Sequence, residues 1–251
     1  MTLENPKISV IVANYNHAPY IKMAVDSILK QTYENFEIII VDDCSTDNSK
    51  EVINELVKLD ERIVEPLLLD KNTGKWNALN QAIAQRSTGQ LITTQDADDA
   101  STPQRLEWTL KTMQKMNSYH TLCGFQNCGS QQEMEKAVGL MAKDIEPPES
   151  EMMSHQEVLK NVYQGYYTNG INHYFTGQFE VHGASALFYK QLWTHGMKFM
   201  PGDMGLRCQK AEDSDFNTKM TLLLQRTSVI KVPFYCYRRG TTTNPAYLEG
   251  L

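Results

Sequence analysis

The chain has 251 residues, of which 41% are hydrophobic and 22% charged, and its formal net charge at pH 7 is −6. This length and composition fit one soluble globular unit with a real core, and they exclude disordered, collagenous and coiled-coil proteins. The acidic balance argues against a protein that binds nucleic acid, because such domains normally carry a basic excess.

No apolar run approaches the ~20 residues that span a bilayer, and the N-terminal residues lack the pattern of a signal peptide. We therefore expect a cytoplasmic protein without an integral membrane segment, and peripheral attachment to a membrane stays open. The five cysteines have no CxxC spacing. They indicate reduced thiols rather than a disulfide framework or a zinc site.

The first half of the chain alternates strand-like and helix-like segments. Its apolar, β-branched runs predict four strands, at 8–13, 36–41, 63–69 and 91–94. Each run is followed by apolar residues at helical spacing, at 19–31, 48–57, 76–83 and 102–113. Asn48 with Glu51 indicates a capping box, and Thr102 with Pro103 indicates the start of the fourth helix. Four such repeats imply parallel βαβ units with helices on both faces of one sheet.

Beyond about residue 120 the pattern weakens. Residues 129–170 are polar and Met-rich and contain no confident strand. Residues 184–189 and 229–237 predict two strands, and 213–224 predict a helix. The inward face of that helix is expected to consist of Phe216, Met220, Leu223 and Leu224. We expect this half to complete the same sheet rather than form a separate domain.

Ligands of parallel α/β sheets bind at the carboxyl ends of the strands. All four predicted ends are polar, namely 13–16, 42–45, 71–75 and 96–99. Two of them are strongly acidic, so this edge of the sheet is the place to look for a site.

Three carboxylates follow the fourth predicted strand within four residues: Asp96, Asp98 and Asp99. Their mutual repulsion raises pKa values unless a cation lies among them. Oxygen ligands select a hard ion, and Mg²⁺ or Mn²⁺ suits a site that takes further ligands from phosphates and water. The alternative is a solvated acidic turn that caps the next helix.

Asp42 and Asp43 close the second predicted strand at the same edge. An ionised carboxylate is only an acceptor, so it can accept the N3 proton of a uracil base or a ribose hydroxyl. The alternative is capping of the following helix.

Five segments of the first half stand in a characteristic order: Ser9–Asn16, Ser27–Tyr33, Phe36–Asp47, Asn72–Lys75 and Asp96–Asp99. Together they resemble family 2 glycosyltransferases of the GT-A fold. The likeness is firm over residues 7–115 and weaker beyond them.

The resemblance implies a nucleotide site. The turn at Ala13 and Tyr15 would hold the nucleotide, with Tyr15 stacked on the base and Asp43 as the second base reader. Gly74 and Lys75 would lie near the base and the phosphates. For Lys75 the alternative is a surface lysine at a helix start.

The resemblance also implies a metal site in the DxD element. Asp96 and Asp98 would contact the nucleotide, with Asp98 on ribose or metal. Asp99 would bind the Mn²⁺ or Mg²⁺ that bridges the diphosphate.

The catalytic base is implied by the match of residues 211–216 to the Glu-Asp motif of the family. Asp213 would take the proton of the acceptor hydroxyl, and Glu212 and Asp215 would assist or cap. The alternative is an acidic cluster that satisfies the helix dipole.

The chain departs from the family after Tyr237, where no histidine follows. Arg238 or Arg239 is a candidate diphosphate clamp, because guanidinium pairs with phosphate oxygens in bidentate fashion. A solvated basic turn is the alternative. Gly183, before the strand at 184–189, would allow close approach of the substrate to the backbone.

We therefore expect one GT-A domain over residues 1–251, an α/β fold with a Rossmann-like, mostly parallel central sheet and helices on both faces. Residues 1–118 are expected to bind the nucleotide sugar, and residues 119–251 the acceptor and the catalytic base.

The implied enzyme is an inverting, metal-dependent glycosyltransferase. It would move a hexose-type sugar from a nucleoside diphosphate sugar, with a UDP-sugar favoured, to a hydroxyl of a glycan, lipid-linked or protein acceptor in polysaccharide or glycoconjugate synthesis. The alternative is an inactive nucleotide-sugar-binding module within a larger assembly. A dehydrogenase is disfavoured because the first strand ends without a glycine-rich turn.

Overall fold

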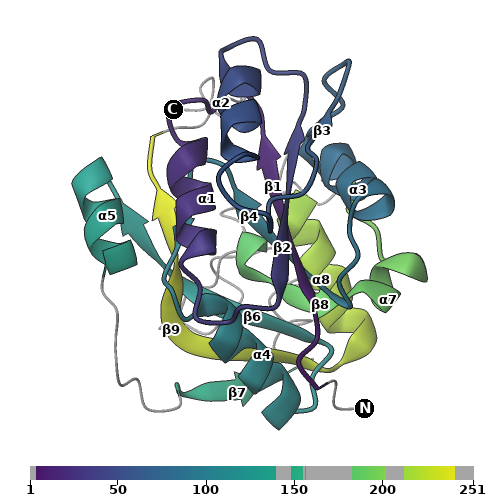
Figure 1. Cartoon of the computed structure of the whole chain (residues 1–251). Coiled ribbons are helices and arrows are strands. Elements are labelled where there is room, and N and C mark those ends of the chain that lie inside the picture. The colour runs from purple at the N-terminus through teal and green to yellow at the C-terminus, as the bar shows by residue number, and fades with distance from the viewer. Residues whose placement is uncertain (1–3, 140–147, 155, 157–182, 202–211, 241–251) are drawn as a thin grey trace.

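The computed structural model describes residues 4–139, 148–154, 156, 183–201 and 212–240. Within them the chain forms a mixed sheet of nine strands with helices on both faces (Figure 1). The strand order is β3-β2-β1-β4-β8-β6-β9-β5, and β7 pairs with β9 outside this path.

The first half builds the parallel part of the sheet, as predicted. Its strands are β1 (Ile8–Asn14), β2 (Phe36–Asp42), β3 (Leu67–Leu68) and β4 (Leu91–Asp96). In the register, Asn14 lies opposite Asp42 and Ala13 lies opposite Asp96. The carboxyl ends of these strands therefore meet at one edge.

The second half continues the same sheet, which confirms that expectation. The short strand β5 (Ala100–Ser101) comes first. The strands that follow it are β6 (His120–Cys128), β7 (Ser150–Met152), β8 (Leu187–Tyr189) and β9 (Thr227–Arg238). β8 runs antiparallel to both β4 and β6, whereas β9 runs parallel to β6. The short β8 thus joins the two halves in one sheet.

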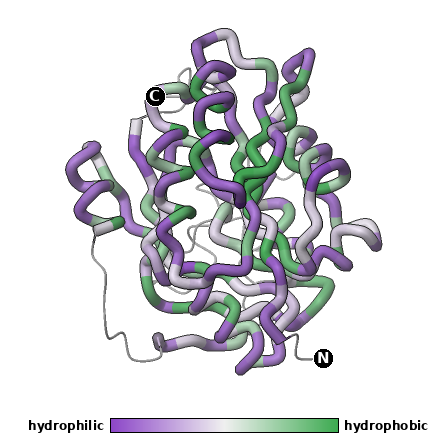
Figure 2. The backbone as a smooth tube through the Cα atoms, in the orientation of Figure 1, coloured by the Kyte–Doolittle hydropathy of each residue, from purple (hydrophilic) through white to green (hydrophobic). Residues whose placement is uncertain are grey.

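Helices cover both faces because successive side chains of a strand point to opposite sides. The helices are α1 (Ile21–Leu29), α2 (Ser49–Leu56), α3 (Lys75–Gln85), α4 (Arg105–Lys115), α5 (Gln131–Gly139), α7 (Lys190–Thr194) and α8 (Glu212–Leu224), with a 3₁₀ turn η3 (Gly183–Ser185). Val10 and Val12 pack with α1, α2 and α4, whereas Ile11 packs with α3 and α8. Figure 2 shows the hydrophobic segments gathered along the central strands.

Several predicted boundaries differ from the structure. Asn48 makes no side-chain capping bond, so the predicted capping box is wrong. α4 begins at Arg105 rather than Pro103, and the amide of Thr102 bonds the carbonyl of Phe234 in β9 at 2.9 Å.

The third strand and the last helix also differ in part. Only Leu67–Leu68 of the predicted strand at 63–69 pairs as a strand, and Ile63 forms an isolated bridge with Ile38. In α8, Phe216 and Met220 are buried as predicted, but Leu223 is 69% exposed, so its predicted inward position is wrong. β6 and α5 were not predicted from the sequence.

A buried carboxylate ties strands together at the edge opposite the carboxyl ends. Glu37 accepts hydrogen bonds from Ser9 Oγ at 2.6 Å and from the amide and hydroxyl of Thr88 at 2.6 and 2.7 Å. It also pairs with Lys7 Nζ at 2.7 Å. Burial alone would raise the pKa of Glu37, but these donors lower it to about 2. A Cβ on the adjacent Gly89 would lie 2.6 Å from the carbonyl oxygen of Lys7, so only glycine fits there.

Four cysteines of the described residues are free thiols, namely Cys44, Cys123, Cys128 and Cys236, and the fifth, Cys208, lies outside them. Among the described helices, none has the length and apolar character needed to cross a membrane.

Candidate active site

The candidate site lies at the carboxyl ends of β1, β2 and β4, where the register places Asn14, Asp42 and Asp96 in neighbouring positions. The loops that follow β1 and β2 begin at these strand ends. Asn16, with a positive φ of 57°, accepts the Thr46 amide at 2.7 Å through its side-chain oxygen and donates its own amide to Ser45 Oγ at 2.8 Å. The loops after β1 and β2 are therefore fixed to each other.

Asp42 supports these loops from inside. Its carboxylate accepts Asn14 Nδ2 at 2.7 Å, the Ser45 amide at 2.9 Å and Ser45 Oγ at 2.5 Å, and the residue has no exposed surface. The structure therefore places Asp42 beneath the edge, where it orders the turn. This corrects its prediction as a nucleotide contact.

Asp43 joins the end of β2 to the turn before α3. One of its oxygens accepts the Thr73 amide at 2.7 Å and the Thr73 hydroxyl at 3.1 Å, and the other accepts the Gly74 amide at 2.8 Å. Gly74 has a φ of +84°, a conformation that other residues adopt only with strain. Asp43 thus shapes the turn that leads into Lys75, and its role as a base reader stays a prediction.

Ala13 and Tyr15 lie at the end of β1, and both are partly exposed. An accessible aromatic ring beside a rigid turn can stack on a planar ligand. The predicted stacking of Tyr15 on a base is therefore compatible with its position.

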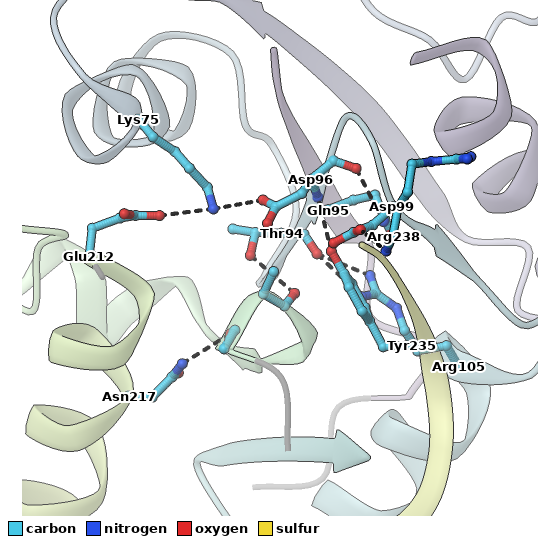
Figure 3. A network of polar contacts seen from close by, with 12 residues as sticks. Lys75, Thr94, Gln95, Asp96, Asp99, Arg105, Glu212, Asn217, Tyr235 and Arg238 are labelled. Carbon is cyan, nitrogen blue, oxygen red and sulfur yellow. Dashed lines mark hydrogen bonds and ion pairs between the residues drawn. The ribbon is translucent and has the colours of Figure 1, made fainter. Parts of the chain in front are cut away.

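Lys75 brings three predicted motifs together (Figure 3). Its ammonium lies 2.7 Å from Asp96 Oδ1 and 2.9 Å from Glu212 Oε1. Burial of the side chain opposes its charge, but Asp96, Glu212 and Asp213 outweigh this effect and raise the pKa of Lys75 well above its usual value. The first turn of α3, the acidic turn and the start of α8 thus form one charged cluster.

Asp99 lies behind the acidic turn and is 1% exposed. Its Oδ1 accepts the backbone amide of Arg238 at 2.8 Å, whereas its buried Oδ2 has no hydrogen-bond partner among the described residues. Burial raises the pKa of Asp99 well above its usual value, and the charges of Asp98 and Asp96 reinforce the shift. A buried carboxylate with an uncompensated oxygen favours a nearby cation.

The guanidinium of Arg238 is used inside the protein. It donates to the carbonyl of Asp98 and to Gln131 Oε1, both at 2.9 Å, and it stacks 4.7 Å from the ring centre of Tyr20. These bonds use Nε and Nη2 of the guanidinium, and the role of Arg238 as a diphosphate clamp stays a prediction. Arg239 is exposed, and its role as a diphosphate clamp stays a prediction.

Two residues that sequence reasoning missed support the acidic turn from below. Tyr235 accepts the amide of Asp96 at 3.1 Å through its hydroxyl. The buried guanidinium of Arg105 donates to the carbonyl of Thr94 at 3.2 and 3.3 Å and lies 5.4 Å from the Tyr235 ring. Burial lowers the pKa of Arg105. No sequence signal distinguished this arginine from a surface arginine of a helix.

Glu212 and Asp213 begin α8. Burial raises the pKa of Glu212, Lys75 opposes the shift and Asp213 reinforces it. Asp213 is partly exposed and packs directly against Gly183. The space above Gly183 is thus occupied by Asp213, which corrects the expectation that this glycine makes room for the substrate.

The donor set fits a divalent cation, although no group of three or more potential ligands is preassembled in the part of the chain that is described. All the candidate ligands are carboxylate oxygens, which Mg²⁺ and Mn²⁺ prefer. The uncompensated Oδ2 of Asp99 and the raised pKa of this residue are the observations that favour a cation here.

Comparisons of sequence identify the family. Residues 9–190 match the family described as "Glycosyl transferase family 2". The putative teichuronic acid biosynthesis glycosyltransferase TuaG of Bacillus subtilis is 34% identical over 188 residues, which cover 72% of this chain and 68% of TuaG. The uncharacterized glycosyltransferase alr2836 of Nostoc sp. is 41% identical over 108 residues, which cover 43% of this chain and 33% of that protein.

Comparisons of structure agree on the fold. TarS 1–349 of S. aureus in complex with UDP-GlcNAc superposes with a TM-score of 0.65 at 21% identity, over 96% of this chain and 60% of that chain. The mannosyltransferase PcManGT of Pyrobaculum calidifontis, in complex with GDP-Man and Mn²⁺, gives 0.63 at 21% identity, over 98% and 61%. The predicted GT-A fold is confirmed, and this chain spans about three fifths of the length of these solved chains.

Proposed function

The chain belongs to glycosyl transferase family 2 and is a glycosyltransferase. We propose that it transfers a sugar from a nucleoside diphosphate sugar to a hydroxyl acceptor with inversion, and that UDP is the preferred nucleotide. The observation that carries the proposal is the bridge of Lys75 to Asp96 and Glu212. It supports the proposal because the ammonium of Lys75 lies beside carboxylates of both the acidic turn and the start of α8.

The donor half comprises residues 1–118 in this proposal. Tyr15 stacks on the base, and Asp43 with the Thr73–Gly74 turn forms the floor beside it. Lys75 lies where it can approach the diphosphate. The complexes of TarS with UDP-GlcNAc and of PcManGT with GDP-Man support a nucleoside diphosphate sugar as donor.

Asp98 and Asp99 would hold a divalent cation, with Asp96 beside them. When bound, Mn²⁺ or Mg²⁺ supplies positive charge to the departing diphosphate. The Mn²⁺ in the PcManGT complex supports this cofactor class.

Asp213 acts as the general base in residues 119–251. Its carboxylate takes the proton of the acceptor hydroxyl while that oxygen bonds the anomeric carbon and the bond to the diphosphate breaks with its electron pair on the phosphate. Glu212, held by Lys75, shares the negative charge at the helix start. The acceptor is proposed to be a glycan, a lipid-linked saccharide or a protein, and the similarity to TuaG supports polysaccharide synthesis.

The test is a donor screen with UDP-, GDP- and TDP-sugars, in which nucleotide release is followed with Mn²⁺ and with EDTA. We expect release from a UDP-sugar that EDTA abolishes. Asp213→Asn is expected to lower turnover by about 10²–10⁴-fold while UDP binding persists.

The matched control is Asp215→Asn, because Asp215 lies on the same first turn but pairs with Lys219. Its turnover should stay close to wild type. Equal effects of the two substitutions would refute the assignment of the base. UDP binding without turnover by any donor would favour the inactive binding module.

A further inference from the structure

The 3₁₀ turn η3 forms a rigid platform between the sheet and α8. Thr94 Oγ1 of β4 donates to the carbonyl of Ala184 at 3.1 Å. Ser185 Oγ accepts the amide of Cys123 in β6 and donates to its carbonyl, both at 3.1 Å. The turn is thus bonded to two strands of the sheet at once.

α8 is tied to this platform through Asn217. The amide nitrogen of Asn217 donates to the carbonyl of Gly183 at 3.0 Å, and its oxygen lies 2.8 Å from His120 Nε2. Figure 3 shows Asn217 of α8 and Thr94 of β4 reaching the same short segment. Because α8 starts at Glu212, this contact fixes the helix within its first two turns.

The donor and acceptor of each hydrogen bond in this network can be assigned from the groups that take part. Asn217 donates to Gly183, so its oxygen is the acceptor, and His120 Nε2 must carry the hydrogen. His120 Nδ1 then accepts from Thr227 Oγ1 at 3.1 Å. Burial lowers the pKa of His120 to about 4, against the opposing effect of Asn217, so the ring stays neutral and keeps this arrangement.

Asp213 and Asn217 stand four residues apart and share one face of α8. Both meet Gly183: Asn217 bonds its carbonyl, and Asp213 fills the space above its Cα. A Cβ at Gly183 would lie 2.8 Å from Asp213 Cβ and still closer to its carboxylate. Any side chain at residue 183 must therefore move Asp213.

We propose that His120, Asn217 and Gly183 are positioning residues for Asp213. His120 orients the amide of Asn217, Asn217 holds Gly183 against α8, and the missing side chain of Gly183 sets where the Asp213 carboxylate lies. The proposal rests on the proposed role of Asp213 as the base, and none of the three residues needs to touch the substrate.

The first test replaces Gly183 by Ala and measures turnover, UDP affinity and melting temperature. A displacement of a catalytic group by about 1 Å costs on the order of 10²-fold in rate. We expect kcat to fall by that order while the Kd for UDP with Mn²⁺ changes less than about twofold. Gly139→Ala is the control, because an added Cβ there meets none of the described residues within 4 Å.

A second pair of variants keeps the test independent of whether Gly183→Ala folds. His120→Leu removes the donor to Asn217, and His120→Gln retains an N–H at the position of Nε2. We expect kcat to fall in the Leu variant and to recover in the Gln variant. A loss of melting temperature without this rescue of kcat would overturn the proposal, because it would mark a purely structural network.

The last test combines Gly183→Ala with Asp213→Asn. If Gly183 acts through Asp213, the combined variant loses no more activity than Asp213→Asn alone. Full multiplication of the two losses would overturn the inference and leave the base assignment intact. No loss in Asp213→Asn itself would instead overturn the proposed function.

Discussion

The ion pair between Lys75 and Glu212 gives a quantitative prediction about how the two halves of the site hold together. Lys75→Met removes the ammonium but keeps the apolar stem, and it leaves Glu212 and Asp96 without their cation. Exposed pairs contribute about 0.2–1 kcal/mol, whereas breaking a buried pair costs about 3–5 kcal/mol. The side chains of Lys75 and Glu212 are 33% and 13% exposed, so we expect a loss of about 2 kcal/mol in the free energy of unfolding, between these limits.

A double-mutant cycle isolates the pair. Urea unfolding followed by tryptophan fluorescence is measured for Lys75→Met, Glu212→Gln and the double variant. We expect the double variant to be more stable than the sum of the single losses predicts, by about 1–2 kcal/mol.

The control is Lys111 with Glu107, an exposed pair on α4 whose side chains are 54% and 31% exposed. Its coupling energy should be about 0.3–0.5 kcal/mol and should fall further in 0.5 M salt, whereas the coupling of the site pair should persist. Equal coupling energies in the two cycles would refute the argument that burial at the site strengthens the Lys75 bridge.

Three further changes test other parts of the structure. The pKa of Glu37 is about 2 in the folded protein, below its ordinary 4.5, so the stabilisation that its charge provides is complete above pH 4.5 and is lost as the pH falls towards 2. The difference in unfolding free energy between wild type and Glu37→Gln, measured in urea, should therefore shrink by about 2 kcal/mol from pH 7 to pH 3. A difference that stays constant over this range would contradict the linkage. Gly89→Ala should lower the melting temperature strongly, because its Cβ would lie 2.6–2.7 Å from backbone atoms. An equal loss in Gly139→Ala, where the added Cβ meets no described residue within 4 Å, would contradict this steric argument. Arg238→Met should cost about 1–3 kcal/mol of unfolding free energy in urea titrations, and Arg239→Met less than about 0.5. The reason is that, within the described part of the chain, only the guanidinium of Arg238 makes hydrogen bonds. Similar losses in the two variants would contradict this difference.

The first half of the fold was predictable because its strands carry strong local signals. β1 and β2 are nearly continuous apolar runs, as expected for parallel strands buried on both faces. β6 carries no such signal: it contains several polar residues, and its pairing with β9 shifts register around Gly124. Strands that depend on a partner one hundred residues away cannot be read from local periodicity.

The position of the candidate site could be predicted from the sequence, but the burial of each side chain could not. The rule that ligands meet strand ends placed Asp42, Asp43 and Asp99 at the correct edge. Their burial depends on partners elsewhere, such as the amide of Arg238 that bonds Asp99. The position of the Arg238 side chain depends on its contacts with Tyr20 and with α5, a helix that was not predicted from the sequence.

The acidic turn shows how partners that are distant in the sequence hold the proposed donor site. Carboxylates this close together repel one another, so their arrangement needs compensation before any ligand binds. Asp96 is compensated by Lys75 of α3, and the turn is held further by Arg238 of β9, through its amide to Asp99 and its guanidinium to the carbonyl of Asp98. Because β9 comes about 130 residues later in the chain, the geometry of the proposed donor site is set by both halves of the protein. A site held in this way requires little reorganisation when charge develops on a leaving group, which is the condition under which fixed charges stabilise a transition state best.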